Sequence, residues 1–179
     1  MWKLALVFLM IFNLACIPKY ALDLRAPWWS APNIEICDDS PVDPKRIIDA
    51  LDWWESISEE YQVGEIYQDV PCDEWVDPGF IRFTYAEDEL LEELNAIAYA
   101  RPHVLDSWII SDDPDAPSRL MFSCSAHLQK MNSKWTIRHE IGHCFGWKHV
   151  LNDTQGHTMS THAGHKKYGL EDYRNLVWY

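Results

Sequence analysis

Apolar residues recur at helical spacing in two separated stretches of the chain. The first stretch, residues 44–60, starts with Pro44, which is favoured in the first turn of a helix. Its apolar positions lie three or four residues apart, which predicts one buried helix face. These positions are Ile47, Ile48, Leu51, Trp54 and Ile57. The second predicted helix runs over 134–145, with Asn132 or Ser133 as its N-cap and Gly146 as its stop.

Short apolar runs with β-branched and aromatic residues predict strands between and after these helices. The predicted strands are 65–70, 80–85, 96–100, 107–111 and 120–126. The acidic stretch 87–95 is typical of one or two helical turns, and 171–179 of a C-terminal helix. This order of elements predicts an α/β (α+β) fold in which helices pack on a twisted mixed sheet.

The N-terminus is typical of an export signal. Residues 4–15 are apolar except for Asn13 and follow a single Lys3, and this run is too short to span a bilayer. The alternative is a buried N-terminal helix. Cys16 at the end of the run predicts either a bacterial lipoprotein signal with lipidation of Cys16, or simple cleavage nearby. We therefore expect an exported protein, secreted or membrane-anchored, that touches a membrane only through this lipid.

Residues 1–16 are thus interpreted as the signal, 17–42 as a linker and irregular N-terminal arm, and 43–179 as one folded domain. The 179 residues suit a single domain, and 10 Trp, 8 Tyr and 6 Phe argue against disorder. The formal charge of −13 argues against nucleic acid as a partner, because few cations are available for phosphates. We expect a monomer.

Four cysteines remain after Cys16, which allows two disulfides in an oxidising compartment. Proximity along the chain favours Cys37 with Cys72 and Cys124 with Cys144. Four free thiols, or a single bridge, are the alternatives.

The chemistry of the chain is concentrated in residues 139–149, HEIGHCFGWKH, which match H-E-x-x-H-x-x-G-x-x-H. Average composition makes this pattern a chance event in about one such chain in 10⁵. His139 and His143 are one helical turn apart, so both imidazoles can reach one metal ion. Gly146 can take the left-handed conformation that ends a helix, after which His149 can supply a third nitrogen. Three imidazoles and an open fourth position are typical of catalytic zinc.

This stretch resembles the signature of the metzincin zinc endopeptidases. Those proteins also have a Met in a turn beneath the metal, and Met159 lies at a suitable distance after His149. Within the metzincins the chain is most similar to small bacterial or phage matrixin-like proteins, through residues 80–83, 96–102 and 170–176. It differs from them at Trp147, where Leu is usual. The resemblance implies a zincin fold with an active-site helix, a Met-turn and a C-terminal helix over 43–179.

The activity implied is that of a zinc metalloendopeptidase with a protein or peptide substrate. His139, His143 and His149 would hold one Zn²⁺, and Glu140 would act as the general base on a zinc-activated water. An extended substrate would pair with an exposed edge strand, for which 96–100 and 120–126 are candidates. The alternative hypothesis is a catalytically silent zinc-binding interaction module on the same scaffold.

A second metal site is a weaker expectation. Asp112, Asp113 and Asp115 crowd one loop, and oxygen ligands at this density are able to hold Ca²⁺. The alternative, which we favour, is a solvated turn whose Asp side chains cap its backbone.

Overall fold

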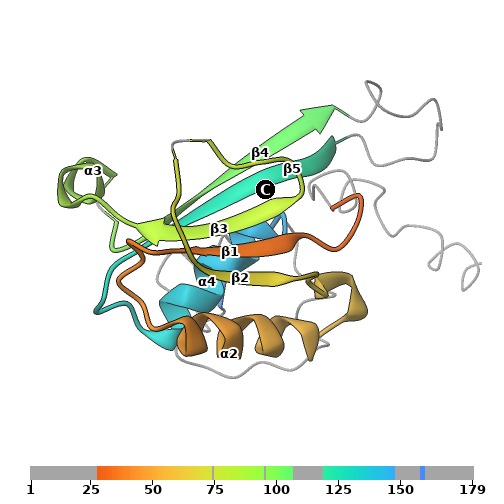
Figure 1. Ribbon diagram of the computed structural model, residues 1–179, viewed down its shortest axis with the longest axis horizontal. Helices are drawn as coiled ribbons and strands as arrows, with labels where there is room; N and C mark the ends of the chain where they lie inside the picture. Colours follow the sequence, from red (N-terminus) through yellow and green to blue (C-terminus); the bar gives the residue numbers. More distant parts are fainter. Residues whose placement is uncertain (1–27, 74, 95, 107–118, 148–157, 160–179) are drawn as a thin grey trace, which may run out of the picture.

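The computed structural model describes residues 28–73, 75–94, 96–106, 119–147 and 158–159 (Figure 1). Within these residues the regular elements are five strands, three α-helices and one 3-10 helix. They are β1 (Asn33–Cys37), α2 (Pro44–Glu55), η2 (Glu59–Tyr61), β2 (Ile66–Val70), β3 (Phe80–Tyr85), α3 (Asp88–Leu94), β4 (Tyr99–Asp106), β5 (Arg119–Leu128) and α4 (Lys134–Cys144).

The five strands form one mixed sheet in the order β2-β1-β3-β5-β4. β1 is parallel to β2 and β3, and β3 is parallel to β5. β4 alone runs antiparallel to its neighbour, β5, and forms one edge of the sheet (Figure 1). The predicted α/β class with a mixed sheet is therefore confirmed.

The prediction of an irregular arm over 17–42 is wrong for Asn33–Cys37, which forms the strand β1 inside the sheet. Ile34 and Ile36 are buried on the same face, in the alternation expected of a strand. Only two apolar residues face the core from this short strand, and neighbouring prolines and acidic residues hide the alternation in the sequence.

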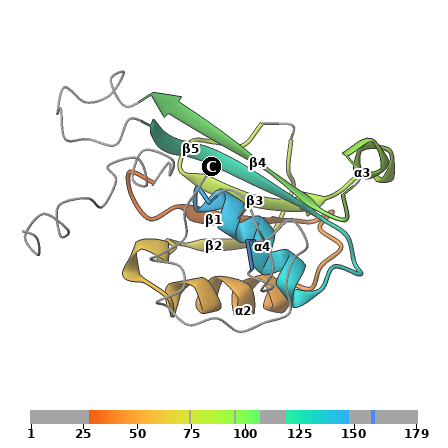
Figure 2. The same cartoon turned by 180° about the vertical axis from the view of Figure 1, so that it is seen from behind.

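Two helices, α2 and α4, cover one face of the sheet, as Figure 2 shows from behind. The core between helices and sheet contains buried side chains from α2, α4, β1, β3 and β5, and Ile66 of β2 and Ala100 of β4 pack against it. Among the fully buried ones are Ile34, Ile47, Leu51, Trp54, Ile81, Phe83, Ile137 and Ile141. α2 starts at Pro44 as predicted and ends at Glu55, because the chain then turns into η2.

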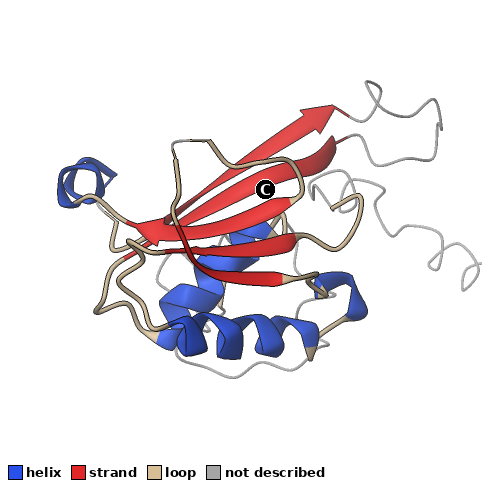
Figure 3. Ribbon diagram, viewed as in Figure 1, coloured by secondary structure: helices blue, strands red, loops and turns tan. Residues whose placement is uncertain are grey.

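The opposite face of the sheet is polar and is crossed by the loop between β2 and β3 (Figure 3). Arg82 of β3 anchors this loop. Its guanidinium donates to the carboxylate of Glu35 on β1 at 2.9 Å and to the backbone carbonyls of Asp73 and Trp75 at 2.8 and 2.6 Å. A buried cation is thereby paired and hydrogen-bonded, as its burial requires.

The strands before α4 depart from their predicted boundaries. β4 occupies Tyr99–Asp106, where the sequence pattern predicts a strand over 96–100 only, and β5 extends the predicted 120–126 in both directions. Pro102 interrupts the β pattern, yet a proline is tolerated in an edge strand such as β4. The acidic stretch forms the short helix α3, as predicted. The predicted strand 107–111 and helix 171–179 lie outside the described residues.

Both predicted disulfides are present, Cys37–Cys72 and Cys124–Cys144. The first joins β1 to the loop after β2, and the second joins β5 to the last residue of α4. Two such bridges fit a protein that folds in an oxidising compartment, as expected for an exported chain. None of the helices among the described residues is long and apolar enough to cross a membrane. The predicted signal, with Cys16, lies outside the described residues.

His127 lies on the polar face of the sheet in contact with three neighbours. Its ring stacks on Tyr99 with centroids 4.2 Å apart, its Nε2 is 2.9 Å from Ser125 Oγ, and its Nδ1 is 3.4 Å from the carbonyl oxygen of Tyr85. Burial lowers the pKa of His127 to about 4, although the hydrogen bond to Tyr85 opposes this shift. The folded protein therefore favours the neutral imidazole.

We expect this histidine to make stability pH-dependent. Because its folded pKa lies below the unfolded value of about 6.5, its contribution is complete above pH 6.5 and is lost as the pH falls towards 4. Urea unfolding at pH 7.5 and 4.5 should show wild type losing about 1–2 kcal/mol more than His127→Phe, which keeps a ring on Tyr99 but cannot titrate. Equal losses in the two proteins would contradict the assignment.

Candidate metal centre

The helix α4 is defined at both ends by local hydrogen bonds. At its start the Ser133 hydroxyl accepts from the backbone N–H of Thr136 at 3.2 Å, so Ser133 is the N-cap. At its end Gly146 has φ +87°, its N–H donates to the His143 carbonyl, and the Trp147 N–H donates to the Gly142 carbonyl. This is a Schellman motif, in which glycine takes the left-handed position. The predicted N-cap and stop signals are both confirmed.

The C-terminal end of α4 is held from two further directions. The Cys124–Cys144 disulfide links it to β5, and the indole N–H of Trp28 donates to the Cys144 carbonyl at 2.8 Å. Trp28 thus satisfies one of the carbonyls that a helix end leaves without an internal partner. Trp147 is buried and packs near Tyr61, with ring centroids 6.3 Å apart. The side chain that departs from the matrixin-like pattern therefore contributes to the core.

Gly142 allows two large side chains to approach the axis of α4. A Cβ at this position would lie 2.2 Å from Met159 Sδ and 2.8 Å from Trp54 Cζ2, far inside contact distance. Met159 and Trp54 are both fully buried. The structure therefore places Met159, the predicted Met-turn residue, directly against the helix that carries His139 and His143.

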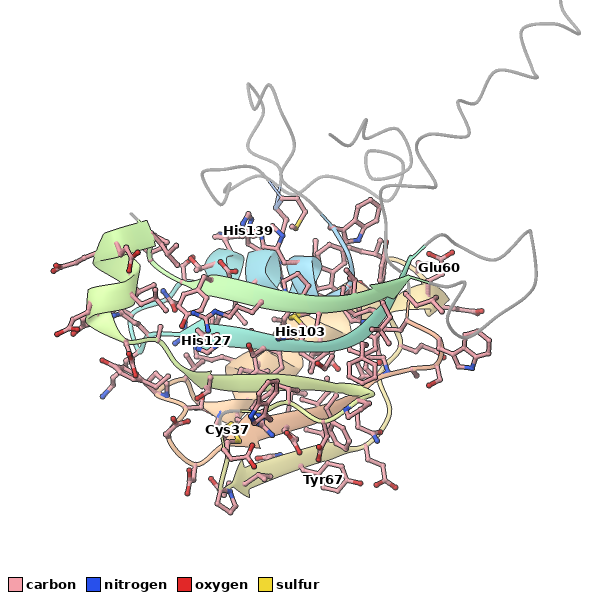
Figure 4. The ribbon with its side chains drawn as sticks, turned by 90° about the horizontal axis from the view of Figure 1, so that it is seen from above. Cys37, Glu60, Tyr67, His103, His127 and His139 are labelled. Atoms are coloured by element: carbon pink, nitrogen blue, oxygen red, sulfur yellow. A yellow bond between two sulfur atoms is a disulfide. The ribbon has the colours of Figure 1, made fainter. Side chains whose placement is uncertain are left out.

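The two histidine rings of α4 are oriented by backbone carbonyls. The Nδ1 of His139 is 2.6 Å from the Thr158 carbonyl oxygen, and the Nδ1 of His143 is 2.7 Å from the Trp147 carbonyl oxygen. Because a carbonyl oxygen only accepts, each Nδ1 carries the proton, and each neutral ring keeps its lone pair on Nε2. Figure 4 shows His139 on α4, beside the edge of the sheet that β4 forms.

These two Nε2 atoms converge on one point. They are 3.1 Å apart, and the rings are perpendicular with centroids 4.7 Å apart. Two nitrogens bound to one tetrahedral zinc at its usual bond length lie about 3.3 Å apart. Two facing lone pairs at this separation repel each other unless a proton or a metal cation lies between them. The donor set and its spacing therefore fit zinc, with Nδ1–carbonyl hydrogen bonds of the kind that support metal-bound histidines.

Glu140 is the acidic group next to this pair. Helical geometry places it about 60° round the axis from His143 and about 100° from His139. Its side chain is only 5% exposed, and burial raises its pKa to about 8. Without a cation nearby the carboxyl is therefore protonated at neutral pH, whereas a divalent cation beside it would favour the carboxylate.

The structure brings together four of the residues that the sequence singles out: His139, His143, Glu140 and Met159. His149, the third predicted ligand, lies outside the described residues, as do Asp112, Asp113 and Asp115 of the predicted calcium loop. Accordingly, within the part of the chain that the structure describes, no group of three or more His, Cys, Asp or Glu side chains is placed to hold a metal ion.

Sequence reasoning missed the groups that orient the imidazoles. Thr158 and Trp147 act through their carbonyl oxygens, and every residue type has such an oxygen, so no side-chain pattern reveals them. It also missed Trp28, whose pairing with the end of α4 spans more than a hundred residues. The geometry of α4 itself was predictable because its signals are local.

Comparison with known proteins adds no family to this picture. No protein-family model matches the chain, and no curated protein is significantly similar to it in sequence.

The contact at Gly142 leads to a stability prediction. In Gly142→Ala the new methyl group must displace Met159 and Trp54, and overpacking of this kind costs about 1–3 kcal/mol. The free energy of unfolding, measured from the denaturation midpoint, should fall by this amount in Gly142→Ala. Met159→Ala and the double variant are measured in the same way. Because Met159→Ala removes the nearest clash, the double variant should be more stable than the sum of the two single effects predicts.

Gly79→Ala is a comparison variant without a packing clash; its backbone effect differs from that at Gly142, which lies inside α4, where alanine is favoured over glycine by about 1 kcal/mol. Gly79 has φ +85° and nothing within 4 Å of the added methyl group, so it reports backbone strain alone, about 1 kcal/mol. Strict additivity of Gly142→Ala and Met159→Ala would show that these two side chains are not in contact.

Proposed function

We propose that the chain is a zinc-dependent endopeptidase of the metzincin type, built on α4. One observation carries the proposal: two buried or half-buried imidazoles present their Nε2 atoms 3.1 Å apart, with both Nδ1 protons committed to backbone carbonyls. A pair of surface histidines has no reason to be so constrained. The spacing H-E-x-x-H-x-x-G-x-x-H, which assigns His149 as the third ligand, supports the same function.

Zinc bound by these histidines would supply a Lewis acid for the attacking water and for the peptide carbonyl. The roles of the chain's own residues follow from their positions. His139 and His143 contribute their Nε2 lone pairs, because the hydrogen bond from each Nδ1–H to a carbonyl fixes the tautomer in which Nε2 carries no proton. Glu140, buried next to the histidine pair, takes the proton from the attacking water and delivers it to the leaving amine. A divalent cation beside Glu140 opposes the effect of burial and favours the carboxylate, which is the form that can accept this proton.

The sheet offers an edge for an extended substrate. β4 lies at the edge next to α4, and its residues from Arg101 to Val104 are exposed (Figure 4). A peptide added along this edge would pass beside the ring of His139. The other predicted candidate, residues 120–126, is wrong, because β5 lies between β3 and β4 and both of its edges are occupied.

Metal binding is the first test of the proposal. The purified protein should bind one Zn²⁺, measured by metal analysis after dialysis and by competition with a chromophoric chelator. His139→Ala should weaken binding by at least 100-fold, because one nitrogen ligand and its carbonyl support are lost together. His103→Ala, which changes an exposed histidine on β4, should leave the affinity unchanged. Equal affinities of the two variants would contradict zinc binding at His139.

Glu140→Gln tests the chemistry separately from the metal. Glutamine resembles the neutral carboxyl that burial favours, so the variant should fold and keep its zinc. Cleavage of a mixed peptide pool, followed by mass spectrometry, should fall by 10²–10⁴ in kcat/KM, the usual contribution of a general base. The control is Glu93→Gln on α3, an exposed acid that should retain wild-type activity.

The same assay separates the proposal from its alternative. A wild-type protein that binds zinc but cleaves no peptide in the pool would be a catalytically silent zinc-binding module. Wild-type cleavage that survives Glu140→Gln undiminished would show that another group is the base.

A further inference from the structure

A pocket of about 430 Å³ lies at one end of the sheet, between α3 and the chain that enters β4. Its lining combines an apolar part with carboxylates. The lining residues are Asp88, Leu91, Glu92, Ala96, Ile97 and Gln129. Ile97 is 64% exposed, so its side chain supplies apolar surface that a ligand can reach. The pocket therefore presents apolar surface to solvent under an acidic rim.

The two rim carboxylates, Asp88 and Glu92, are exposed to solvent. Asp88 accepts a hydrogen bond from the Gln129 amide, a neutral donor. Among the residues that the structure describes, neither Asp88 nor Glu92 takes part in an ion pair. Helix α3 itself, DELLEEL, has four acidic residues and no basic one. A ligand that complements this pocket has a cationic end and an aliphatic stem.

The pocket is continuous with the start of the edge strand. Ile97 precedes β4 by two residues, and its carbonyl accepts a hydrogen bond from the Asn132 amide at 2.8 Å, just before the N-cap of α4. Figure 1 shows α3 at the end of the sheet where β4 begins. His139 lies about 9 Å along α4 from Ser133, at 1.5 Å per residue. An extended peptide rises about 3.3 Å per residue, so a few residues on the β4 edge reach from the Ser133 end of α4 to the level of His139.

We propose that this pocket, formed by Asp88, Glu92, Leu91 and Ile97, binds a lysine or arginine side chain of the peptide substrate a few residues from the cleaved bond. The aliphatic stem lies on Leu91 and Ile97, and the cationic end lies at the two carboxylates. The inference rests on the proposed function for its substrate class. It adds a charge preference that the zinc motif does not contain.

The experiment uses peptides of one sequence that place lysine, norleucine or glutamate in turn at each of four positions on either side of the cleaved bond. Norleucine keeps the stem and removes the charge. At one position kcat/KM should be five- to tenfold higher for lysine than for norleucine, with glutamate the poorest. Because the rim is exposed to solvent, the preference should shrink between 10 mM and 500 mM salt.

Variants on α3 assign the preference to the pocket. Glu92→Gln should reduce the lysine preference two- to fivefold, and Glu92→Lys should reverse it in favour of glutamate. Glu93→Gln is the matched control, because Glu93 is the next residue of the same helix, is exposed and does not line the pocket. Ile97→Ala should lower kcat/KM for the lysine and norleucine peptides alike, because both place the same stem on the pocket.

A binding measurement distinguishes failure of this inference from failure of the proposed function. Fluorescence anisotropy of labelled lysine and norleucine peptides with the Glu140→Gln protein requires no hydrolysis. Tighter binding of the lysine peptide that is lost in Glu92→Gln supports the pocket even if wild type cleaves nothing, and the endopeptidase proposal then fails alone. Equal binding and equal cleavage of the two peptides, or the same loss in Glu93→Gln as in Glu92→Gln, overturns the inference.

Discussion

The depth at which α4 sits in the molecule depends on the contact between Gly142, Met159 and Trp54. Only a residue without a side chain lets the thioether of Met159 and the indole of Trp54 touch the helix together. Thr158, the neighbour of Met159, then has its carbonyl oxygen 2.6 Å from the His139 ring. The packing contact comes from Met159, and the hydrogen bond that orients the His139 imidazole comes from the adjacent Thr158. One short turn therefore both supports the helix and orients its first histidine ring.

Burial around this turn creates an electrostatic conflict that a cation resolves. His139 and Glu140 are each about 95% buried, and the two Nε2 lone pairs face each other. Burial disfavours a carboxylate, which is why the pKa of Glu140 is raised to about 8. A divalent ion bound by both imidazoles would have two effects. It would remove the repulsion between the Nε2 lone pairs, and it would stabilise the negative carboxylate of Glu140. A proton between the rings would remove the lone-pair repulsion without stabilising the carboxylate, and this difference supports the proposed zinc site.

Local signals explain what the sequence predicts well. The Ser133 cap, the stop at Gly146 and the spacing of His139 and His143 act within one or two helical turns, and the structure has them where the pattern predicts. Strand β1 and the full length of β4 were missed, because β1 has few inward apolar residues and Pro102 interrupts β4. The carbonyl partners of the imidazoles depend on tertiary contacts between distant segments and leave no side-chain signal.

The chain order β3-α3-β4-β5-α4 explains why one edge of the sheet and the helix that carries His139 and His143 lie together. β5 pairs parallel to β3, so the segment between them must return in the opposite direction, and it does so as β4 on the outer side of β5. α3 occupies the turn that begins this return, and α4 leaves β5 at the same end. Asp88, Leu91 and Glu92 of α3 share a pocket with Ala96 and Ile97, which lead into β4. Under the proposed function, α3 is therefore an element whose charge can change without altering the contact of Gly142 with Met159 and Trp54 beneath His139.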